Sequence, residues 1–596
     1  QPSLHRYNIL TLRPMLWEHS AIGLPPLITS GFNADFDGDT MAVYLTVLAQ
    51  KDAHRMEVTR HLLSVANGDW MLATGHELAA GIHVATGAKA PTELAHRDLA
   101  AKNWNLKELR ERLVKEWLEQ GPKAALVLAK TAADLAFETA TQAGLTLSHF
   151  DLEPVRLTWA DKERLGMDPD KWEKAVHAKS AALGVRHPLR VYLESGTKLT
   201  SKTLNQMAGG RGVINRLRVV AGAPPVLIRS NFYEGMHPLE FFASAHGSRS
   251  SLADKKLGVS HTGTFTRHLV HAAFDLRITD KTCSETQGIV LMDLRGLPER
   301  KPGTPDTDWS KSIMLPVRFD LRKRLVGRVT LEDIAGTSIK AGDLLDEAKV
   351  KDLTDKVFAL RVRSSFTCTS GPGKICAACY GWDPSTRQLP GKGTWVGIIA
   401  GQSIGERATQ LTFRTFHSGG AKGETDTSGF TRIRRLFAGG KLDVRSAGEN
   451  VEQPRTLWDM LYAWEEEQAK SPTASVGGPV VVVPNQTKQA VLSLTPWDLL
   501  LSATHMEFFD AYKGSVHEKH AEVILRALKD TAASIAKDTP ARMLGIARAA
   551  GSPTDRAGAL AFGRWRDCLK QIRDDGRITL SLKSARARIM LSLMGR

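Results

Sequence analysis

Three aspartates at alternate positions, Asp35, Asp37 and Asp39, constrain the fold of this chain more than any other feature. In a regular strand they would share one face, in a row with neighbours ~6–7 Å apart. They converge on one point only if the backbone loops, and Gly38 permits such a loop. Converging carboxylates repel one another unless a cation lies among them, and hard oxygen ligands suit Mg²⁺. We therefore expect a magnesium loop of the kind used in phosphoryl and nucleotidyl transfer.

Two other interpretations of these aspartates are a Ca²⁺ loop and a polar turn. An EF-hand loop has a glutamate at about its twelfth position. Counted from Asp35, that position is Thr46 in this chain, so the EF-hand pattern is not met. The polar turn stays open as the alternative to a magnesium site.

The cysteines are too few and too unevenly spaced for a disulfide framework, so we expect a reducing compartment. Cys368, Cys376 and Cys379 form a C-x7-C-x2-C pattern, and two thiolates separated by two residues can bind one Zn²⁺ from a tight turn. A tetrahedral site needs a fourth ligand, and Cys283 is the remaining upstream cysteine. A redox pair or unligated thiols are the alternatives. Cys568 lies in a helical pattern and is expected to be a buried apolar thiol.

The chain of 596 residues carries a formal net charge of +16. A large protein this basic is expected to bind a polyanion, with nucleic acid as the first candidate, whereas a basic charge spread over the surface is the alternative. The apolar share of 42% and charged share of 24% exclude a mostly disordered or collagen-like chain. No apolar run approaches the ~18 residues that a membrane-spanning helix needs.

Hydrophobic periodicity and turn residues divide the chain into segments of different predicted structure. We expect strands and loops over residues 1–50, 286–363 and 441–505, and helices over residues 51–82, 100–145, 238–276 and 516–596. A helix followed by a loop is expected over residues 394–417, and a flexible loop over residues 418–429. Pro238 suits the first turn of the long helix. Gly247, Gly258 and Gly263 lie within it, and because each costs ~1 kcal/mol relative to alanine we expect a bendable helix.

The segment NADFDGD, residues 33–39, resembles the catalytic loop of the β′ (largest) subunit of multisubunit DNA-directed RNA polymerases. Further segments are similar to the same family and occur in the same order. The resemblance implies that the three aspartates are catalytic and hold one Mg²⁺ of a two-metal mechanism of template-directed ribonucleotidyl transfer. It also implies that Arg13, in LRPMLWEHS, contacts the incoming nucleotide and that Asn33 contacts the ribose hydroxyls.

The segment WVGIIAGQSIGERATQLTFRTFHSGG is similar to the trigger-loop helix of the family. The resemblance implies that Gln410 and Phe413 bind substrate, and that Arg414 and His417 are catalytic. His417 would lie near the triphosphate, as a positional catalyst or as a proton donor to pyrophosphate. Phe413 stands where the family often has methionine, and Arg-Ala at residues 407–408 replaces a usual Pro-Gly pair, which predicts a stiffer hinge.

Residues 238–276 are similar to the bridge helix of the family, and MAGGRGVINRLRVVAG is similar to the basic loop behind it. On this resemblance Arg211, Lys256 and Arg267 would bind nucleic acid. The four cysteines other than Cys568 match the family's second zinc site in order, which implies one structural Zn²⁺. This chain has one residue more than the family between its second and third ligand cysteines.

The resemblance implies a multidomain α+β fold. In chain order it implies a partial double-psi β-barrel with the catalytic loop (1–50), a helical pore or funnel region (51–195), a basic loop behind the bridge helix (196–230), the bridge helix (231–277), a zinc-bearing cleft module (278–390), the trigger loop (391–440), a strand-rich jaw-like region (441–510) and a helical C-terminal region (511–596).

The resemblance implies an enzyme that is active only with partners. These are one or more β-like subunits, a separate chain carrying the N-terminal part of β′, DNA template, nascent RNA, nucleoside triphosphates and an initiation factor. The chain begins at Gln1, shortly before the aspartates, so we expect a β′ subunit divided between two chains, as in large DNA phages. A truncated chain is the alternative. The expected location is the cytoplasm of a bacterial host cell or a virion.

Two other functions are compatible with parts of the sequence. A single-chain RNA-templated polymerase shares the aspartate loop, but the similarity through the zinc site and trigger loop argues against it. A non-catalytic subunit that binds nucleic acid or serves assembly could keep the same fold. The presence of all three aspartates and of His417 argues against a loss of catalysis.

Overall fold

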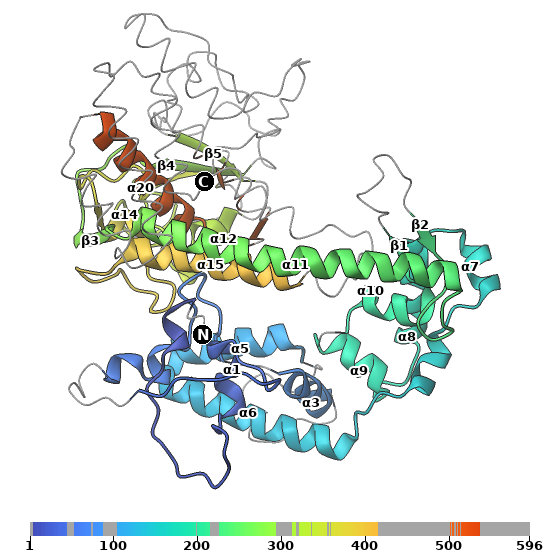
Figure 1. Cartoon of the computed structure of the whole chain (residues 1–596). Coiled ribbons are helices and arrows are strands. Elements are labelled where there is room, and N and C mark those ends of the chain that lie inside the picture. The colour runs from blue at the N-terminus through green and yellow to red at the C-terminus, as the bar shows by residue number, and fades with distance from the viewer. Residues whose placement is uncertain are drawn as a thin grey trace, which may run out of the picture. The chain divides into compact units, whose positions relative to one another are not determined.

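The structure is a computed structural model (Figure 1). It describes residues 4–44, 53–72, 75–87, 104–197, 199–214, 226–293, 313–317, 321–334, 336–353, 357, 359–414, 501, 504–505, 508, 511–512 and 514–536. The predictions for His417, the loop 418–429, Cys568 and most of residues 441–505 lie outside the described residues.

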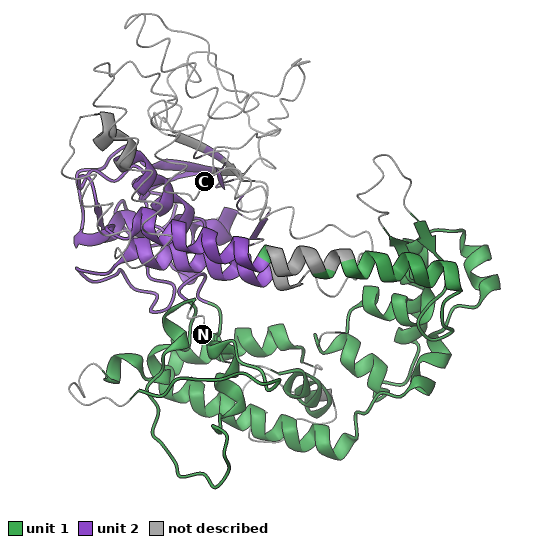
Figure 2. Cartoon of the chain, viewed as in Figure 1, with its two compact units in different colours: residues 1–64, 69–258, 413–425 green, residues 65–68, 259–412, 426–596 purple. Residues whose placement is uncertain are grey.

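The chain divides into two compact units, shown in Figure 2. The first consists of residues 1–64, 69–258 and 413–425, and the second consists of residues 65–68, 259–412 and 426–596. The elements of the first unit are η1 (Arg6–Asn8), η2 (Pro26–Ile28), α1 (Thr29–Phe32), η3 (His54–Met56), η4 (Val58–Arg60), α3 (His76–Gly87), α5 (Leu106–Gln120), α6 (Pro122–Ala143), η5 (His149–Val155), α7 (Trp159–Leu165), α8 (Pro169–Ala181), α9 (Pro188–Glu194), α10 (Ser201–Leu204), the π-helix η6 (Asn205–Gly209), β1 (Gly212–Ile214) and β2 (Val226–Ile228).

The prediction of strands over residues 1–50 is wrong for the described residues 4–44. They form short helical turns and loops, with one isolated bridge between Thr11 and Glu57. An apolar segment becomes a strand only where another segment pairs with its backbone N–H and C=O groups. The described part of this unit offers these residues only that single bridge, so the segment stays in turns and loops.

Helices α3, α5 and α6 pack around one apolar core, as the helical prediction for residues 100–145 requires. Asn105 caps α5 in a capping box with Glu108. The contact of α3 with α6 depends on small residues, because a Cβ at Gly81 would lie 1.9 Å from the carbonyl oxygen of Ala136. A second core surrounds Trp172 of α8, whose side chain is fully buried.

Helix α11 (Pro238–Ala273) is continuous over 36 residues, which confirms the long helix predicted over residues 238–276. Its N-terminal part belongs to the first unit and its C-terminal part, from Val259, belongs to the second (Figure 2). The hairpin β1–β2 is antiparallel and precedes α11 in the chain.

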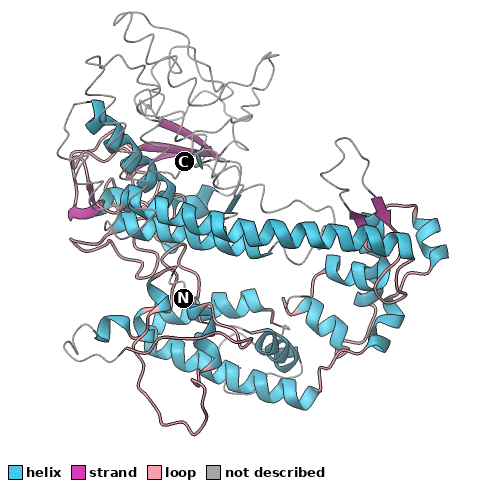
Figure 3. Ribbon diagram, in the orientation of Figure 1, coloured by secondary structure: helices cyan, strands magenta, loops and turns pink. Residues whose placement is uncertain are grey.

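In its described residues the second unit combines two small sheets with helices; strands and helices are coloured in Figure 3. Its elements after α11 are β3 (Arg277–Asp280), β4 (Ile289–Asp293), β5 (Ile313–Val317), α12 (Leu321–Leu325), α13 (Glu347–Lys351), β6 (Ala359–Val362), β7 (Lys374–Cys376), α14 (Ala377–Tyr380), α15 (Val396–Arg414) and α20 (Lys519–Ala536). Strand β4 lies between β5, which is parallel to it, and β6, which is antiparallel. Strands β3 and β7 form a parallel pair. The short strands predicted over residues 286–363 are confirmed at β4, β5 and β6, whereas α12 and α13 in the same range are helices.

Helix α15 lies beside the C-terminal part of α11 (Figure 1), and three glycines at four-residue spacing make this possible. A Cβ at Gly397 would lie 1.7 Å from the carbonyl oxygen of Ala273, and one at Gly401 would lie 2.9 Å from the amide nitrogen of Val270. A Cβ at Gly405 would meet the Thr266 side chain. The two helices thus pack almost backbone to backbone. Among the residues that the structure describes, no helix has the length and apolar character needed to cross a membrane.

Candidate functional site

The three aspartates lie in a loop that begins at the end of α1. Asn33 ends this helix in the left-handed region, with φ 51°, and Gly38 has φ 126°. These two positions turn the chain, so the segment is a loop and not the regular strand in which the carboxylates would stand apart. Carboxylate oxygens of Asp35, Asp37 and Asp39 all lie within 4.8 Å of one another, and the three residues are exposed.

The electrostatics of this loop favour a cation. A hydrogen bond with the Asp35 carboxyl, followed by the negative charges of Asp35 and Asp39, raises the pKa of Asp37. The Asp35 amide also donates to the Asp39 carboxylate at 3.0 Å, which orients that group within the loop. Because like charges at this range oppose ionisation, a cation among the oxygens would stabilise all three carboxylates. An all-oxygen, carboxylate-rich donor set of this kind fits Mg²⁺.

The other residues predicted to contact substrate are placed as follows. Arg13 and Asn33 are exposed, and both belong to the same unit as the aspartates. Gln410, on α15, is half-buried and hydrogen-bonds to Glu406 and Arg407 of the same helix, at 2.9 and 2.8 Å. Phe413 and Arg414 form the end of α15, but their side chains lie outside the described residues.

The residues predicted to bind nucleic acid differ in exposure. Arg211 is only 4% exposed, its guanidinium hydrogen-bonds to Gln206 and Ser244, and burial lowers its pKa. Arg267 is half-buried on α11. Lys256 also lies on α11, and its side chain is outside the described part of the chain. Their roles in nucleic-acid binding stay predictions, and Arg211 as seen here is enclosed by protein.

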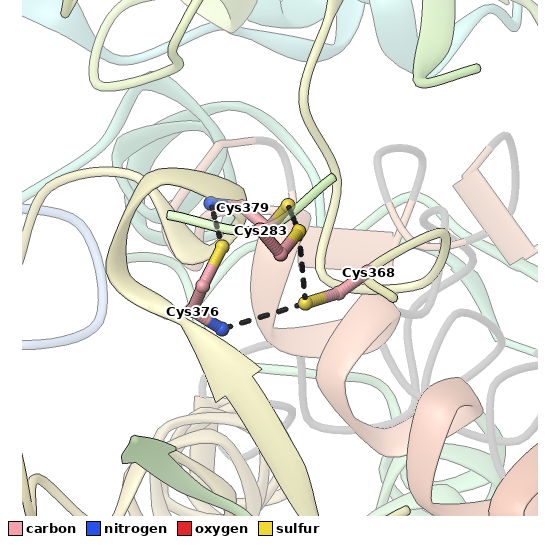
Figure 4. Close-up of side chains that lie close together, drawn as sticks. All are labelled: Cys283, Cys368, Cys376 and Cys379. Atoms are coloured by element: carbon pink, nitrogen blue, oxygen red, sulfur yellow. Dashed lines mark hydrogen bonds between the residues drawn. The ribbon is translucent and has the colours of Figure 1, made fainter. Parts of the chain in front are cut away.

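The structure brings four cysteines together in the second unit (Figure 4). Cys376 ends β7 and caps α14, and Cys379 lies in that short helix. Cys368 comes from the preceding loop, and Cys283 comes from the loop after β3. The amide of Cys376 donates to the Cys368 sulfur at 3.4 Å, and that of Cys379 donates to the Cys376 sulfur at 3.3 Å. Backbone N–H groups thus already face the sulfurs.

The spacing of the sulfurs fits a tetrahedral metal. Zn–S bonds of ~2.3 Å place the sulfurs of such a site ~3.8 Å apart. The Cys283 sulfur lies 3.8 Å from that of Cys368 and 3.6 Å from that of Cys379. Hydrogen bonds within the cluster lower the pKa of Cys283 to about 4, through Cys379, and raise that of Cys376 to about 12, through Cys368. The thiols therefore compete for protons, and all four ionise together only with a cation among them.

Sequence reasoning missed charged residues around the cysteines. Arg363, directly after β6, directs one guanidinium nitrogen to the sulfurs of Cys283 and Cys379, at 3.7 and 3.6 Å. The same nitrogen donates to the Cys283 carbonyl at 3.4 Å. The position of Arg363 five residues before Cys368 is the feature of the sequence that could have indicated this contact. Arg526 and Asp530, on the distant helix α20, also contact the cysteine loop, and no local pattern indicated them.

Comparison with known proteins identifies two matching families of domains. The family described as RNA polymerase Rpb1, domain 2, matches residues 1–64. The family described as RNA polymerase Rpb1, domain 5, matches residues 235–493. The first match contains the aspartate loop, and the second contains α11, the four cysteines and α15.

Curated relatives agree with these domain matches. The β′ subunit of the DNA-directed RNA polymerase of Aquifex aeolicus is 28% identical over 599 residues, which cover 83% of this chain and 37% of the relative. The β′ subunit from Symbiobacterium thermophilum is 26% identical, with 88% of this chain and 54% of the relative covered. That from a Hydrogenobaculum species is 30% identical, with 70% and 32% covered. The matched regions span about a third to a half of these relatives.

The matched domains and the relatives together define the class of protein: this chain belongs to the family of the largest subunits of RNA polymerases. Within that family it is β′-like, and its similarity is to the C-terminal portion of the subunit.

Proposed function

We propose that this chain carries the catalytic part of a multisubunit DNA-directed RNA polymerase, a nucleotidyltransferase that extends RNA on a DNA template. One observation carries this proposal. Asp35, Asp37 and Asp39 converge in a loop, within the segment that matches a domain of the largest RNA polymerase subunit. A turn with a purely structural role would not need three mutually repelling carboxylates within such a short range.

The three carboxylates would hold Mg²⁺. When bound, a divalent cation supplies charge stabilisation and a lower pKa for an attacking hydroxyl, and a second ion supports the triphosphate in a two-metal mechanism. The protein's own part is to keep the carboxylates ionised, converging and accessible. The left-handed Asn33 and the hydrogen bond from the Asp35 amide to Asp39 support this role.

The residues around the loop receive their roles from the family resemblance. Arg13 would contact the incoming nucleotide, and the Asn33 side chain would contact the ribose hydroxyls. At the end of α15, Gln410 and Phe413 would pack against the nucleotide. Beyond them, Arg414 and His417 would act at the triphosphate, His417 as a positional catalyst or a proton donor. Exposure of Arg13 and Asn33 is compatible with contact to a ligand.

Partner chains and nucleic acid complete the proposed enzyme. The net charge of +16 supports binding to DNA and RNA phosphates, through residues such as Lys256 and Arg267 and in a salt-dependent manner. Met15, Leu16 and Trp17 are 83%, 101% and 54% exposed, and such apolar exposure supports a partner chain that covers them. The proposed partners are a β-like subunit, a second chain with the N-terminal part of β′ and an initiation factor.

The four cysteines would hold one structural Zn²⁺, which the sulfur distances and the Arg363 contacts support. The domain boundaries given above, including a partial double-psi barrel and a trigger loop, belong to the same proposal. So do a division of β′ between two chains of phage type and a location in the host cytoplasm or a virion.

A primer-extension assay tests the catalytic proposal. The chain would be purified with its partner subunits and supplied with DNA template, RNA primer, ribonucleotides and Mg²⁺. We expect extension by the wild type and its loss with Asp37→Ala. The matched control is Asp134→Ala, which removes an exposed aspartate of α6 that pairs with Lys130 in the same unit.

Three results would contradict the proposal in different ways. Equal extension by the wild type and Asp37→Ala would remove the aspartate loop from catalysis. A preference for an RNA template would favour the RNA-templated alternative. No extension by a wild-type complex that contains all its partner subunits would favour a non-catalytic assembly role.

A further inference from the structure

Helix α20 lies along the loop that carries the cysteines. Glu522, Arg526 and Asp530 are spaced four residues apart, so they share one face of this helix. They contact residues 364–373 in order along the loop. Glu522 accepts a hydrogen bond from the Ser364 hydroxyl at 2.5 Å, and the Ser364 hydroxyl in turn accepts the amide of Phe366 at 3.1 Å.

Arg526 binds the backbone of the cysteine loop with both ends of its guanidinium. One nitrogen donates to the carbonyl of Cys368 at 2.5 Å and to that of Phe366 at 3.4 Å. The other donates to the carbonyl of Gly371 at 3.2 Å. The planar guanidinium can satisfy several carbonyls only when the loop curves around it. Cys368 and Arg526 are 158 residues apart in the chain, so this is a purely tertiary contact.

Asp530 completes the contact at the far end of the loop. Its carboxylate accepts the amide of Gly373 at 3.0 Å and pairs with the Nε of Arg526 at 3.0 Å. Gly371 and Gly373 have φ of 91° and 70°, so the loop has the tight curvature that this pairing requires. The next strand, β7, then delivers Cys376 into the cluster.

We propose that α20 is a positioning element of the cysteine site, and that metal binding by the four cysteines and docking of α20 stabilise one another. The inference rests on the proposed zinc site. Its physical basis is linkage, because a ligand that binds only the docked arrangement shifts the equilibrium toward it, and the effect is reciprocal. Residues that hydrogen-bond to metal ligands hold those ligands in orientation. Their substitution commonly lowers metal affinity by ~10–100-fold.

Hydrogen exchange on the wild-type chain, in its complex, tests one direction of this coupling. Zinc would be removed with a chelator and then restored. We expect amide exchange in residues 519–530 of α20 to increase on removal and to recover on addition of zinc. Helix α6 of the other unit is the internal control and should not change. Equal protection of α20 with and without zinc would overturn the inference.

Zinc affinity tests the other direction, by competition with a chromophoric chelator. We expect Arg526→Ala to weaken zinc binding by about 10–100-fold and Arg526→Lys to recover part of the loss. The control is Arg112→Ala, since Arg112 forms an equivalent i,i+4 pair with Glu116 at 2.8 Å and with similar burial, far from any cysteine in sequence and in the other unit. If Arg526→Ala does not fold, Asp530→Ala replaces it, and we expect this variant also to bind zinc more weakly than the wild type.

The outcomes separate the two proposals. If the wild type binds no more zinc than Cys379→Ser, the zinc site and this inference both fail. If the wild type binds zinc through its cysteines while Arg526→Ala stays within about twofold of it, the zinc site stands and the role of α20 is overturned.

Discussion

Gly397 of α15 lies against Ala273 of α11 so closely that a Cβ at Gly397 would be 1.7 Å from the Ala273 carbonyl oxygen. Gly401 and Gly405 repeat this close approach one and two turns later. The two helices that resemble the bridge helix and the trigger-loop helix are therefore in direct backbone contact within one unit. The two helices lie too close together to accommodate a side chain larger than that of glycine at these three positions.

The close contact between the two helices predicts that a glycine-to-alanine substitution lowers stability at Gly401 but not at Gly263. Gly401→Ala should destabilise the second unit by about 1–3 kcal/mol, because the new methyl group must push α11 away. Gly263→Ala is the control and should be neutral or stabilising by about 1 kcal/mol. Among the described residues, no atom outside its chain neighbours and its own helix backbone lies within 4 Å of its would-be Cβ. Denaturant unfolding measures both. A neutral Gly401→Ala would contradict the packing described here.

The buried ion pair of Arg328 with Glu522 predicts a large effect on stability. Two hydrogen bonds of 3.0 and 2.6 Å join them, and both side chains are almost completely buried. Glu522→Ala leaves the Arg328 charge uncompensated and should cost about 3–5 kcal/mol in free energy of unfolding. Asp134→Ala removes an exposed pair with Lys130 and should cost less than about 1 kcal/mol. Similar losses in the two variants would show that Arg328 is solvated in solution.

Arg363 predicts a specific loss of zinc affinity. Because its guanidinium contacts the sulfurs of Cys283 and Cys379, it offsets negative charge on the thiolates. Arg363→Ala should weaken zinc binding by about 10-fold or more. Arg361→Ala, two residues earlier, removes a contact with Glu332 and should leave zinc binding unchanged. Chelator competition distinguishes the two, and equal affinity in both variants would exclude a role for Arg363.

The partly buried His517, whose side chain is 12% exposed, predicts a loss of stability in acid. Its Nδ1 accepts the Lys519 amide and its Nε2 faces the Val326 carbonyl at 3.3 Å, an arrangement suited to the neutral ring. Burial lowers the pKa of His517 from 6.5 to about 3. Between these values the unfolded chain binds a proton that the folded chain does not, so stability falls as the pH decreases from about 6.5 toward 3.

The variant His517→Gln isolates this contribution. It cannot titrate, so the difference in unfolding free energy between wild type and variant should change with pH across that window and be constant above it. Chemical denaturation at a series of pH values measures the difference. A pH-independent difference would mean that His517 is accessible to protons in the folded state.

Much of the candidate site could be predicted from local spacing. The three aspartates with Gly38 indicated a convergent loop, and the pattern of Cys368, Cys376 and Cys379 indicated a metal-binding turn. The long helix α11 followed from its pattern and from Pro238. Strands over residues 1–50 could not be predicted correctly, because a strand depends on pairing partners that its own sequence does not specify.

The sequence by itself determined which residues are candidates for the chemistry, because carboxylates, thiols and glycines act through their own type and their spacing to near neighbours. Only the tertiary structure decided which distant groups complete each arrangement. The sequence named Cys283 as a fourth cysteine, and the structure places it beside Cys368 across 85 residues. Arg526, which contacts the cysteine loop across 158 residues, is found only in the tertiary structure. Such contacts arise from the packing of whole elements, where burial and geometry select one partner among many chemically equivalent residues.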